Sequence, residues 1–575
     1  MVENPLQMST VVGLEIGSIN TRAFLFDVVE ESYRLIASAV TPSTHIEPVF
    51  DIGDAIFEVL SRLQDVTGRV FLDHDANLIV PSQPGGEGID CLVTTTSCVP
   101  DLKLAIFGLL NEVSMDSARK LANASYARIV EAISINDRRP YSAQLDAIVA
   151  AQPDLILFAG GTDNGANRSL QRIADLISTA LRVLPRSNRP PVLFCGNPAL
   201  RDPMRQLFER HTKVRVADNL RPSLQEEVLE PAELELNEMI IEKTYEKVGG
   251  LQRIVPLCSI SPRLSNHSFH RVIRFLGQKY DPAKGVLGVD IGATYSVASY
   301  ANRVTSTLNT FHLGMGEGMA DVLQGSKIQE ISQWLDQPVP EDEVRDYLWQ
   351  RSLYPNSLAS SPLELSIELA AARQILQLIM RELTLRDACP STRFEPILMS
   401  GSVLTRTATP AQSLLAILDG IQPQGISPVI LDKHGVAATL GTLAEITPLL
   451  SVQVLESSAF TNLATVVNIT SRARRGVTVS VARLDYSDGH TAEVEVKQGS
   501  IAVLPLPSGS KAQLYLKPVR RTEIEEVDSI AEPVLVNGGV CGVVLDARGR
   551  PLKMPADEQH RIALLKEWES LLNHQ

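Results

Sequence analysis

One short stretch near the start of the chain combines a carboxylate, a glycine and several small polar residues. It reads VGLEIGSINTRAFLF over residues 12–26. A glycine lets a ligand approach the backbone closely, and hydroxyl, amide and backbone N–H groups can cradle an anion. The groups that could do so here belong to Gly17, Ser18, Asn20 and Thr21. The stretch predicts a phosphate-binding turn, although an ordinary hairpin would have the same pattern.

A second stretch repeats this layout and reads LGVDIGATYSVASYA over residues 287–301. Aligning Asp290 with Glu15 also aligns Gly292 with Gly17. Internal repetition is a stronger signal than either stretch alone, although chance repetition is the alternative. Two carboxylates that face one set of phosphates could hold a hydrated Mg²⁺, because this ion keeps several of its waters. We therefore expect Glu15 and Asp290 to be the catalytic residues and to hold Mg²⁺ through water.

A third glycine turn follows an apolar run. It lies within residues 158–167, which read FAGGTDNGAN. Ligands of open α/β sheets bind beyond the carboxyl ends of the strands, so this turn could line a site. The candidate residues are Gly160, Gly161, Thr162 and Asp163. A plain strand-to-helix loop, with local hydrogen bonds from Asp163 or Asn164, is the alternative.

A fourth turn, Ser400-Gly401-Ser402, also ends an apolar run and precedes a helix-like segment. Its glycine would let the backbone approach a flat ring or a phosphate. The turn lies downstream of the second repeat, where a two-lobed nucleotide clamp needs a nucleoside pocket. A simple strand-to-helix turn is again the alternative.

Apolar runs and amphipathic segments predict the elements that hold these turns. Residues 12–16 and 23–26 read as two strands of a hairpin. Between Cys91 and about Asn219, strand-like runs such as LKLAIFGLL and DLILFAGG alternate with helix-like runs, which indicates a parallel sheet covered on both faces. After about Ser451, VTVSVARLDY and TAEVEVKQGSIAVLPLP alternate on a two-residue period, which is typical of β-strands.

The overall composition limits the partners and the compartment. The chain has 575 residues, of which 44% are hydrophobic and 21% are charged, as in ordinary globular proteins. A net charge of -14 argues against nucleic acid or an anionic membrane as the main partner, because both need positive surface. The sequence shows no signal peptide, no membrane-spanning run and no paired cysteine motif. We therefore expect a cytoplasmic protein with reduced cysteines.

Four segments, taken in their order along the chain, resemble those of a known family. They are the two hairpins, GGTDNG at residues 160–165 and MSGSVLTRTATPAQ at residues 399–412. The family is that of the MutL-type accessory proteins of glutamate (methylaspartate) mutase, which belong to the superfamily of actin, sugar kinases and heat-shock ATPases. The likeness covers about residues 10–450. It implies an α/β, two-lobed actin-like ATPase fold with ATP and Mg²⁺ held between the lobes, and a doubly wound α/β insert.

The resemblance also suggests how the chain is divided. We expect a β-rich domain with a C-terminal helix to follow the actin-like part. The expected segments are a first actin-like half with phosphate loop 1 (10–84), the insert (85–222), a mixed helical connector (223–282), a second half with phosphate loop 2 and the adenosine motif (283–450), and the β-rich domain (451–575).

Carried over residue by residue, the resemblance assigns three sets of ligand-binding residues. The first loop is Gly17, Ser18, Asn20, Thr21 and Arg22, the second is Gly292, Ala293 and Thr294, and the adenosine motif is Gly401 and Ser402. Four positions depart from the family pattern. Glu15 replaces Asp, Arg22 replaces Lys, and Tyr295 and Ser296 replace Thr and Asp. Losing that Asp would remove a carboxylate that orients water or metal, which predicts an ATPase that is weak at most.

The resemblance implies a reactivating, chaperone-like factor for an adenosylcobalamin-dependent mutase, with a mutase subunit as partner. An actin-like pseudo-ATPase that acts as a scaffold or filament subunit is the alternative, and the departures at Glu15 and Ser296 favour it. Homo-oligomers would accompany that alternative. A small-molecule kinase is a third option, for which the sequence offers no identifiable substrate pocket or base.

Overall fold

The computed structural model describes residues 8–163, 165, 167–281, 283–519, 522–523 and 533–573. These residues form two compact units. The first unit contains the described parts of Met1–Ser43, Ala55–Thr95 and Leu257–Gln575, and the second contains those of Thr44–Asp54 and Thr96–Pro256.

The first sheet of the first unit has five strands in the order β10-β4-β1-β2-β3. Their bounds are β1 Val11–Ile16, β2 Asn20–Val29, β3 Ser32–Pro42, β4 Cys91–Thr96 and β10 Arg263–Leu264. Strands β1, β2 and β3 form an antiparallel meander. Every residue of β1 is buried, so its apolar run VVGLEI forms the centre of the sheet.

The second sheet of this unit begins with the same arrangement. Its eight strands have the order β13-β12-β11-β14-β15-β16-β24-β20. The first five are β11 Gly285–Ile291, β12 Ser296–Ala301, β13 Ser306–Phe311, β14 Phe394–Ser400 and β15 Ile426–Leu431. In both sheets the strand that opens the motif has its two hairpin partners on one side and at least two other strands on the other. In the second sheet, β16, β24 and β20 continue beyond these two. This duplication confirms the expected α/β fold with two similar halves.

The C-terminal part of the chain is rich in β-structure, as expected. Strands β16 Thr461–Asn468, β20 Ile501–Leu504 and β24 Val543–Asp546 extend the second sheet. A separate four-stranded sheet has the order β19-β18-β21-β23. Its strands are β18 Thr478–Tyr486, β19 Thr491–Lys497, β21 Lys511–Pro518 and β23 Val534–Asn537. A further two-stranded sheet pairs β17 Thr470–Ser471 with β22 Thr522–Glu523.

The helices of the first unit include one long helix, α12 (Pro362–Leu385), whose buried apolar residues belong to the main core of the second sheet. Ser361 begins it by accepting a hydrogen bond from the Glu364 N–H. The other helices are α1 Ile52–Thr67, α8 Ser265–Lys279, α9 Met319–Gly325, α10 Ile328–Ser332, α11 Glu341–Leu353, α13 Ser402–Thr405, α14 Pro410–Ile421, α15 Ala437–Leu443, α16 Pro448–Leu455 and α17 Glu558–Asn573.

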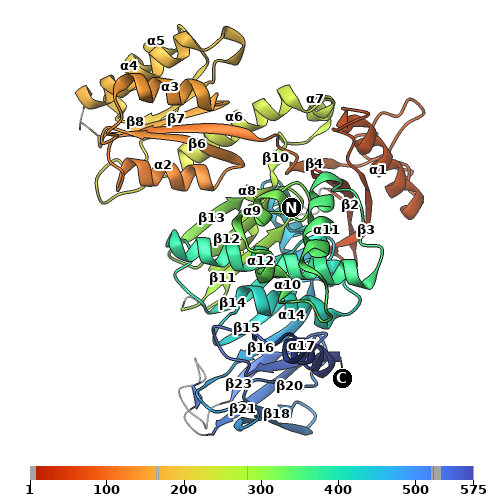
Figure 1. The fold of residues 1–575 in the computed structure, drawn as a ribbon. Helices are drawn as coiled ribbons and strands as arrows, with labels where there is room; N and C mark the ends of the chain where they lie inside the picture. The colour runs from red at the N-terminus through yellow and green to blue at the C-terminus, as the bar shows by residue number, and fades with distance from the viewer. Residues whose placement is uncertain are drawn as a thin grey trace. The chain divides into compact units, whose positions relative to one another are not determined.

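The second unit contains the doubly wound insert that the sequence predicts. Its five strands are all parallel, in the order β6-β5-β7-β8-β9. Their bounds are β5 Leu102–Gly108, β6 Ala127–Ser134, β7 Leu155–Gly160, β8 Val192–Gly196 and β9 Val214–Val216. The helices are α2 Ser114–Asn123, α3 Tyr141–Ala151, α4 Asn167–Val183, α5 Arg201–Phe208, α6 Glu230–Lys247 and α7 Leu251–Ile254. Helix α2 covers one face of the sheet, and α3 and α4 cover the other (Figure 1).

The cysteines and the helix hydropathy agree with the expectations from composition. All six cysteines are free thiols, and four of them are buried. Within the described part of the chain, each helix is too short or too polar to cross a lipid bilayer.

Candidate functional site

The two repeated hairpins close in the same way. The Gly17 N–H donates to the Asn20 carbonyl over 3.0 Å, and the Gly292 N–H donates to the Tyr295 carbonyl over 3.0 Å. A Cβ atom on Gly292 would lie 2.5 Å from the Tyr295 oxygen, so this turn needs a glycine. The sequence repeat is therefore also a repeat of backbone geometry.

The two turns meet at their tips, within the first unit. The Thr294 hydroxyl lies 3.0 Å from Ser18 Oγ and 3.2 Å from Glu317 Oε2. Ser18 and Thr294 were both predicted as phosphate-binding residues, and the fold brings them together. Glu317, which is exposed, was not predicted. It adds a carboxylate next to a turn in which Ser296 replaces the expected Asp.

The carboxylates behind the turns are grouped around one guanidinium. Glu15 and Arg22 are direct cross-strand partners in the first hairpin, and Arg22 Nη1 donates to Glu15 Oε2 over 2.8 Å. The Arg22 side chain also interacts electrostatically with Asp290 and Asp432. Although burial opposes it, these three negative charges raise the pKa of Arg22. Three acids and one base therefore form the site's charged centre, which we call the acidic cluster: Glu15, Arg22, Asp290 and Asp432.

Asp432 was missed by sequence reasoning. It directly follows β15 and is 1% exposed, and its carboxylate accepts from three successive backbone N–H groups at the start of α15. These belong to Gly435, Val436 and Ala437, at 2.8 to 3.0 Å. The signal was available, because Asp432 ends an apolar run three residues before a glycine. It therefore resembles the two acids that were found.

Burial and mutual repulsion change the protonation of two of these acids. Burial raises the pKa of Asp290 to about 6, and the Glu15 charge adds to this effect while Ser400 and Arg22 oppose it. Burial also raises the pKa of Asp432 to about 6, although the backbone N–H groups of α15 lower it. Both carboxyls therefore retain protons at a higher pH than ordinary aspartates do.

A cavity of about 200 Å³ adjoins the acidic cluster. Asn20 and Arg22 line it from the first sheet, and Ser400, Gly401 and Ser402 line it from the second. Gly401 has a φ of +126°, and a Cβ atom there would lie 2.6 Å from the Ile291 oxygen. Only glycine therefore fits where β14 passes the end of β11. The predicted adenosine motif and the first phosphate loop thus share one cavity.

Other residues of the predicted phosphate loops use their polar groups in hydrogen bonds within the protein. Thr21 is fully buried, and its hydroxyl lies 2.9 Å from Ser43 Oγ. The Ala293 carbonyl accepts from the N–H groups of Gly316 and Gly318. Of the predicted phosphate-loop residues, Asn20 and Arg22 line the described cavity. The others do not line it, so their ligand-binding role stays a prediction: Gly17, Ser18, Thr21, Gly292, Ala293 and Thr294.

Ser296, the departure from the expected Asp, has a structural partner. Its side chain is fully buried and donates to the Leu313 carbonyl over 2.7 Å. It occupies the same place in its hairpin as Thr21 does in the first, since Ile16 pairs with Thr21 and Ile291 pairs with Ser296. A carboxylate at this position would face a carbonyl oxygen with no proton between them.

We therefore expect Ser296→Asp to destabilise the protein by about 2 to 4 kcal/mol rather than to restore a catalytic group. Urea unfolding at pH 7.5 measures the loss. Ser306→Asp, at the exposed start of the neighbouring strand β13, is the matched control and should change stability by less than about 0.5 kcal/mol. If the two variants were equally stable, position 296 would not need a neutral hydrogen-bond donor.

The turn of the insert is also held by internal hydrogen bonds. The Asn219 amide donates to the Gly161 carbonyl over 2.8 Å and to Asp163 Oδ1 over 2.9 Å. The Asp163 N–H donates to the Pro222 carbonyl. These contacts join the turn to residues 219–222, far along the chain, rather than within the loop as the alternative interpretation expected, and Asn164 lies outside the described residues. The role of Gly160, Gly161, Thr162 and Asp163 in ligand binding stays a prediction.

The acidic cluster has the donor chemistry that a hydrated Mg²⁺ needs. Within the described residues, no three His, Cys, Asp or Glu side chains are arranged to hold a metal by themselves. Mg²⁺ does not need such a group, because it keeps several waters and is often held by one or two carboxylates and the phosphates of a nucleotide. Glu15 and Asp290 fit this role, since a cation would offset the repulsion between them.

Comparison with known proteins gives one extended family match. The model of the family described as MutL protein matches residues 11–459. A curated relative, Protein MutL of Clostridium tetanomorphum, is 26% identical over 155 residues. That alignment covers 27% of this chain and 32% of the relative, so the chain spans about a third of the relative's length.

Solved structures resemble the chain only distantly. Nucleotide-free acetone carboxylase is 12% identical, with 85% of this chain and 81% of that one covered and a TM-score of 0.34. A nucleotide-free diol dehydratase-reactivating factor is 11% identical, with 77% and 100% covered and a TM-score of 0.31. Xylulose kinase from Bifidobacterium adolescentis is 11% identical, with 79% and 94% covered and a TM-score of 0.27. These TM-scores are too low to support an argument about function.

Proposed function

Since the chain belongs to the MutL protein family, we propose that it is an ATP-binding accessory factor that reactivates an adenosylcobalamin-dependent mutase such as glutamate mutase. The observation that carries the nucleotide part of this proposal is the contact between the two glycine turns, through Ser18 and Thr294. The mutase part rests on the family. The partner would be a mutase subunit in the cytoplasm.

Each group of the site has a distinct role in this proposal. Ser18 and Thr294, with backbone N–H groups of the two turns, bind the phosphates. Gly401 and Ser402 leave room for the adenosine, because the Gly401 backbone can approach a ring closely. Glu15 and Asp290 orient the waters of Mg²⁺, which supplies positive charge at the phosphates when it is bound. Arg22 holds Glu15 in place and faces the same cavity.

Affinity for MgATP should depend on pH through Asp290 and Asp432. Their pKa values of about 6 lie above the ordinary value, so both carboxyls bind protons as the pH falls through 6. A cation favours the ionised forms, so we expect affinity to fall from pH 7.5 to pH 5, by about tenfold for each carboxyl that must ionise. Calorimetry at both pH values measures this, with buffer ionisation corrected. Constant affinity over this range would contradict the proposed role of the cluster.

The same pKa values determine how stability responds to pH without ligand. The native state holds the two protons up to about pH 6, whereas the unfolded chain releases them near pH 4. These two groups therefore favour the folded state most below pH 4, and their contribution declines as the pH rises to 6.

The proposed function is tested with an inactivated mutase. The full-length chain, MgATP and an inactivated adenosylcobalamin-dependent mutase are mixed, and mutase activity is followed after adding fresh cofactor. We expect recovery that needs both the chain and MgATP. A lack of recovery, with no ATP binding detected by calorimetry, would overturn the proposal.

The burial of Ser296 favours a second candidate, a pseudo-ATPase that binds nucleotide and acts as a scaffold or filament subunit. With the hydroxyl of Ser296 used by Leu313, this position supplies no carboxylate for hydrolysis. Electron microscopy with and without ATP separates the candidates. Filaments support the scaffold, and a discrete complex with a mutase supports the accessory factor.

A further inference from the structure

A second, larger cavity lies among helices of the first unit and has a volume of about 570 Å³. This is within the usual range for pockets that bind small molecules, about 300 to 1,000 Å³. Its walls come from α12, α14 and α17 and from the segments around Trp334 and Ser360. Among the described residues, it shares only Arg406 with the lining of the candidate nucleotide cavity. It is therefore a separate site.

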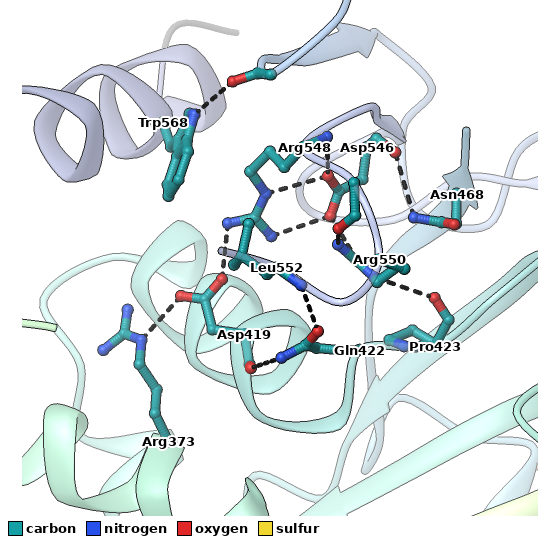
Figure 2. Close-up of polar contacts among 12 residues, drawn as sticks. Arg373, Asp419, Gln422, Pro423, Asn468, Asp546, Arg548, Arg550, Leu552 and Trp568 are labelled. Atoms are coloured by element: carbon teal, nitrogen blue, oxygen red, sulfur yellow. Dashed lines mark hydrogen bonds and ion pairs between the residues drawn. The ribbon is translucent and has the colours of Figure 1, made fainter. Parts of the chain in front are cut away.

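One wall of this cavity is the end of a buried chain of ion pairs (Figure 2). Arg373 Nε donates to Asp419 over 2.9 Å, and Arg548 donates to the other oxygen of Asp419 over 2.6 Å. Arg548 and Arg550 both bind Asp546, at 2.9 and 2.7 Å. The side chains of Asp419, Asp546, Arg548 and Arg550 are at most 3% exposed.

This chain of ion pairs contains more bases than acids. It contains three guanidinium groups and two carboxylates. Although burial alone would raise it, the pKa of Asp546 lies well below its ordinary value because of the Arg548 and Arg550 charges. The Asp546 carboxylate is therefore ionised, and the chain of ion pairs contains one more guanidinium group than carboxyl groups. A buried charge without a counter-ion is costly, which favours binding of an anion.

Among the three arginines of this chain of ion pairs, Arg373 lines the cavity. The Arg373 side chain is only 9% exposed, and Asp419 accepts from its Nε, which leaves the two terminal amino groups without a hydrogen-bond partner among the described residues. Figure 2 shows these two nitrogens directed away from Asp419. Arginine binds carboxylates through such pairs of N–H groups.

A second donor in the lining also has no partner. Trp334 is 4% exposed, and its indole N–H finds no acceptor within the described structure. Its ring lies 5.7 Å from the Arg373 guanidinium carbon. Unpaired buried donors are rare in folded proteins, so a ligand acceptor would satisfy this one.

The rest of the lining indicates the polarity and the charge of the remainder of the ligand. Leu365, Leu369, Leu415 and Leu565 contribute apolar surface, and Trp568 contributes an aromatic ring. Three other acids of the lining have partners among the described residues, but only that of Glu368 is a base. Glu368 pairs with Arg351, Asp336 accepts from Ser366, and Glu569 accepts from Gln412. These extra negative charges disfavour a ligand with two charges and favour a single one.

We propose that this cavity binds a small organic monocarboxylate whose anionic group pairs with Arg373 and Trp334 and whose apolar body lies against the leucines and Trp568. The carboxylate balances the excess charge of Arg373, Arg548 and Arg550.

Benzoate and hexanoate are suitable probes, with benzyl alcohol as a neutral control. Calorimetry and tryptophan fluorescence of the full chain at pH 7.5 measure binding. We expect saturable, one-to-one binding of at least one carboxylate, and none of benzyl alcohol. Absence of saturable binding, or equal binding of the alcohol, would overturn the proposal.

Two variants and a control test the assigned donors. Arg373→Gln should weaken carboxylate binding at least about tenfold, and Asp419 stays paired with Arg548 in this variant. Trp334→Phe keeps an aromatic ring but removes the N–H, so it should weaken carboxylate binding several fold. This variant tests the proposal independently if Arg373→Gln does not fold. Arg381→Gln, exposed on the same helix, should bind like wild type. Unchanged binding by Arg373→Gln or Trp334→Phe would contradict the assignment.

Discussion

Replacing Arg22 with alanine is expected to destabilise the protein by about 3 to 5 kcal/mol at pH 7.5, because it removes the partly buried base whose charge offsets those of three acids. Glu15 loses a 2.8 Å ion pair, and Asp290 and Asp432 lose a positive charge that favours their ionised forms. Urea unfolding measures the change. Arg34→Ala, at an exposed position on the adjacent strand β3, is the matched control and should have little effect.

The pH dependence of this loss separates electrostatics from packing. At pH 5, Asp290 and Asp432 are largely protonated, since their pKa values are about 6. Fewer negative charges then need Arg22, so the Arg22→Ala variant should lose less stability at pH 5 than at pH 7.5. A loss that is the same at both pH values would indicate that Arg22 contributes packing rather than charge.

Asp290→Asn should have the opposite effect on stability and a large effect on ligand binding. The amide keeps the size of the side chain but removes a repulsive charge next to Glu15, so stability at pH 7.5 should be unchanged or higher. MgATP affinity should fall about tenfold to a hundredfold, because a carboxylate that orients the metal waters is lost. Calorimetry with MgATP measures the affinity.

Asp346→Asn, on the exposed side of α11, is the control for Asp290→Asn and should bind MgATP like wild type. A stable Asp290→Asn protein with wild-type affinity would mean that this carboxylate does not contact the metal waters. Reduced affinity with reduced stability would instead indicate a structural role.

The twin hairpins could be predicted because their signal is local and occurs twice. Apolar runs, a carboxylate and a glycine bend at fixed spacing define each turn, and the strand order of the two sheets follows the same repeat. The contact between Glu15 and Arg22 could also have been deduced. Both residues lie at the same distance from the turn, so an antiparallel hairpin places them opposite each other.

The rest of the site could not be read from the sequence because it depends on distant segments. Asp432 reaches the acidic cluster only because β15 is placed beside β14 in the sheet. The partner of the Thr21 hydroxyl is Ser43, which directly follows β3, 22 residues later in the chain. The extension of the second sheet by β16, β24 and β20 depends on pairings between residues far apart in the chain. No local pattern specifies such pairings.

The central claim is that the turns at residues 17–20 and 292–295 bind one triphosphate together. Hydrogen–deuterium exchange of the full chain, with and without MgATP, tests it most directly. The account predicts that MgATP slows amide exchange in both turns at the same nucleotide concentration. Protection of only one turn, or of neither turn while ATP binds elsewhere, would contradict it.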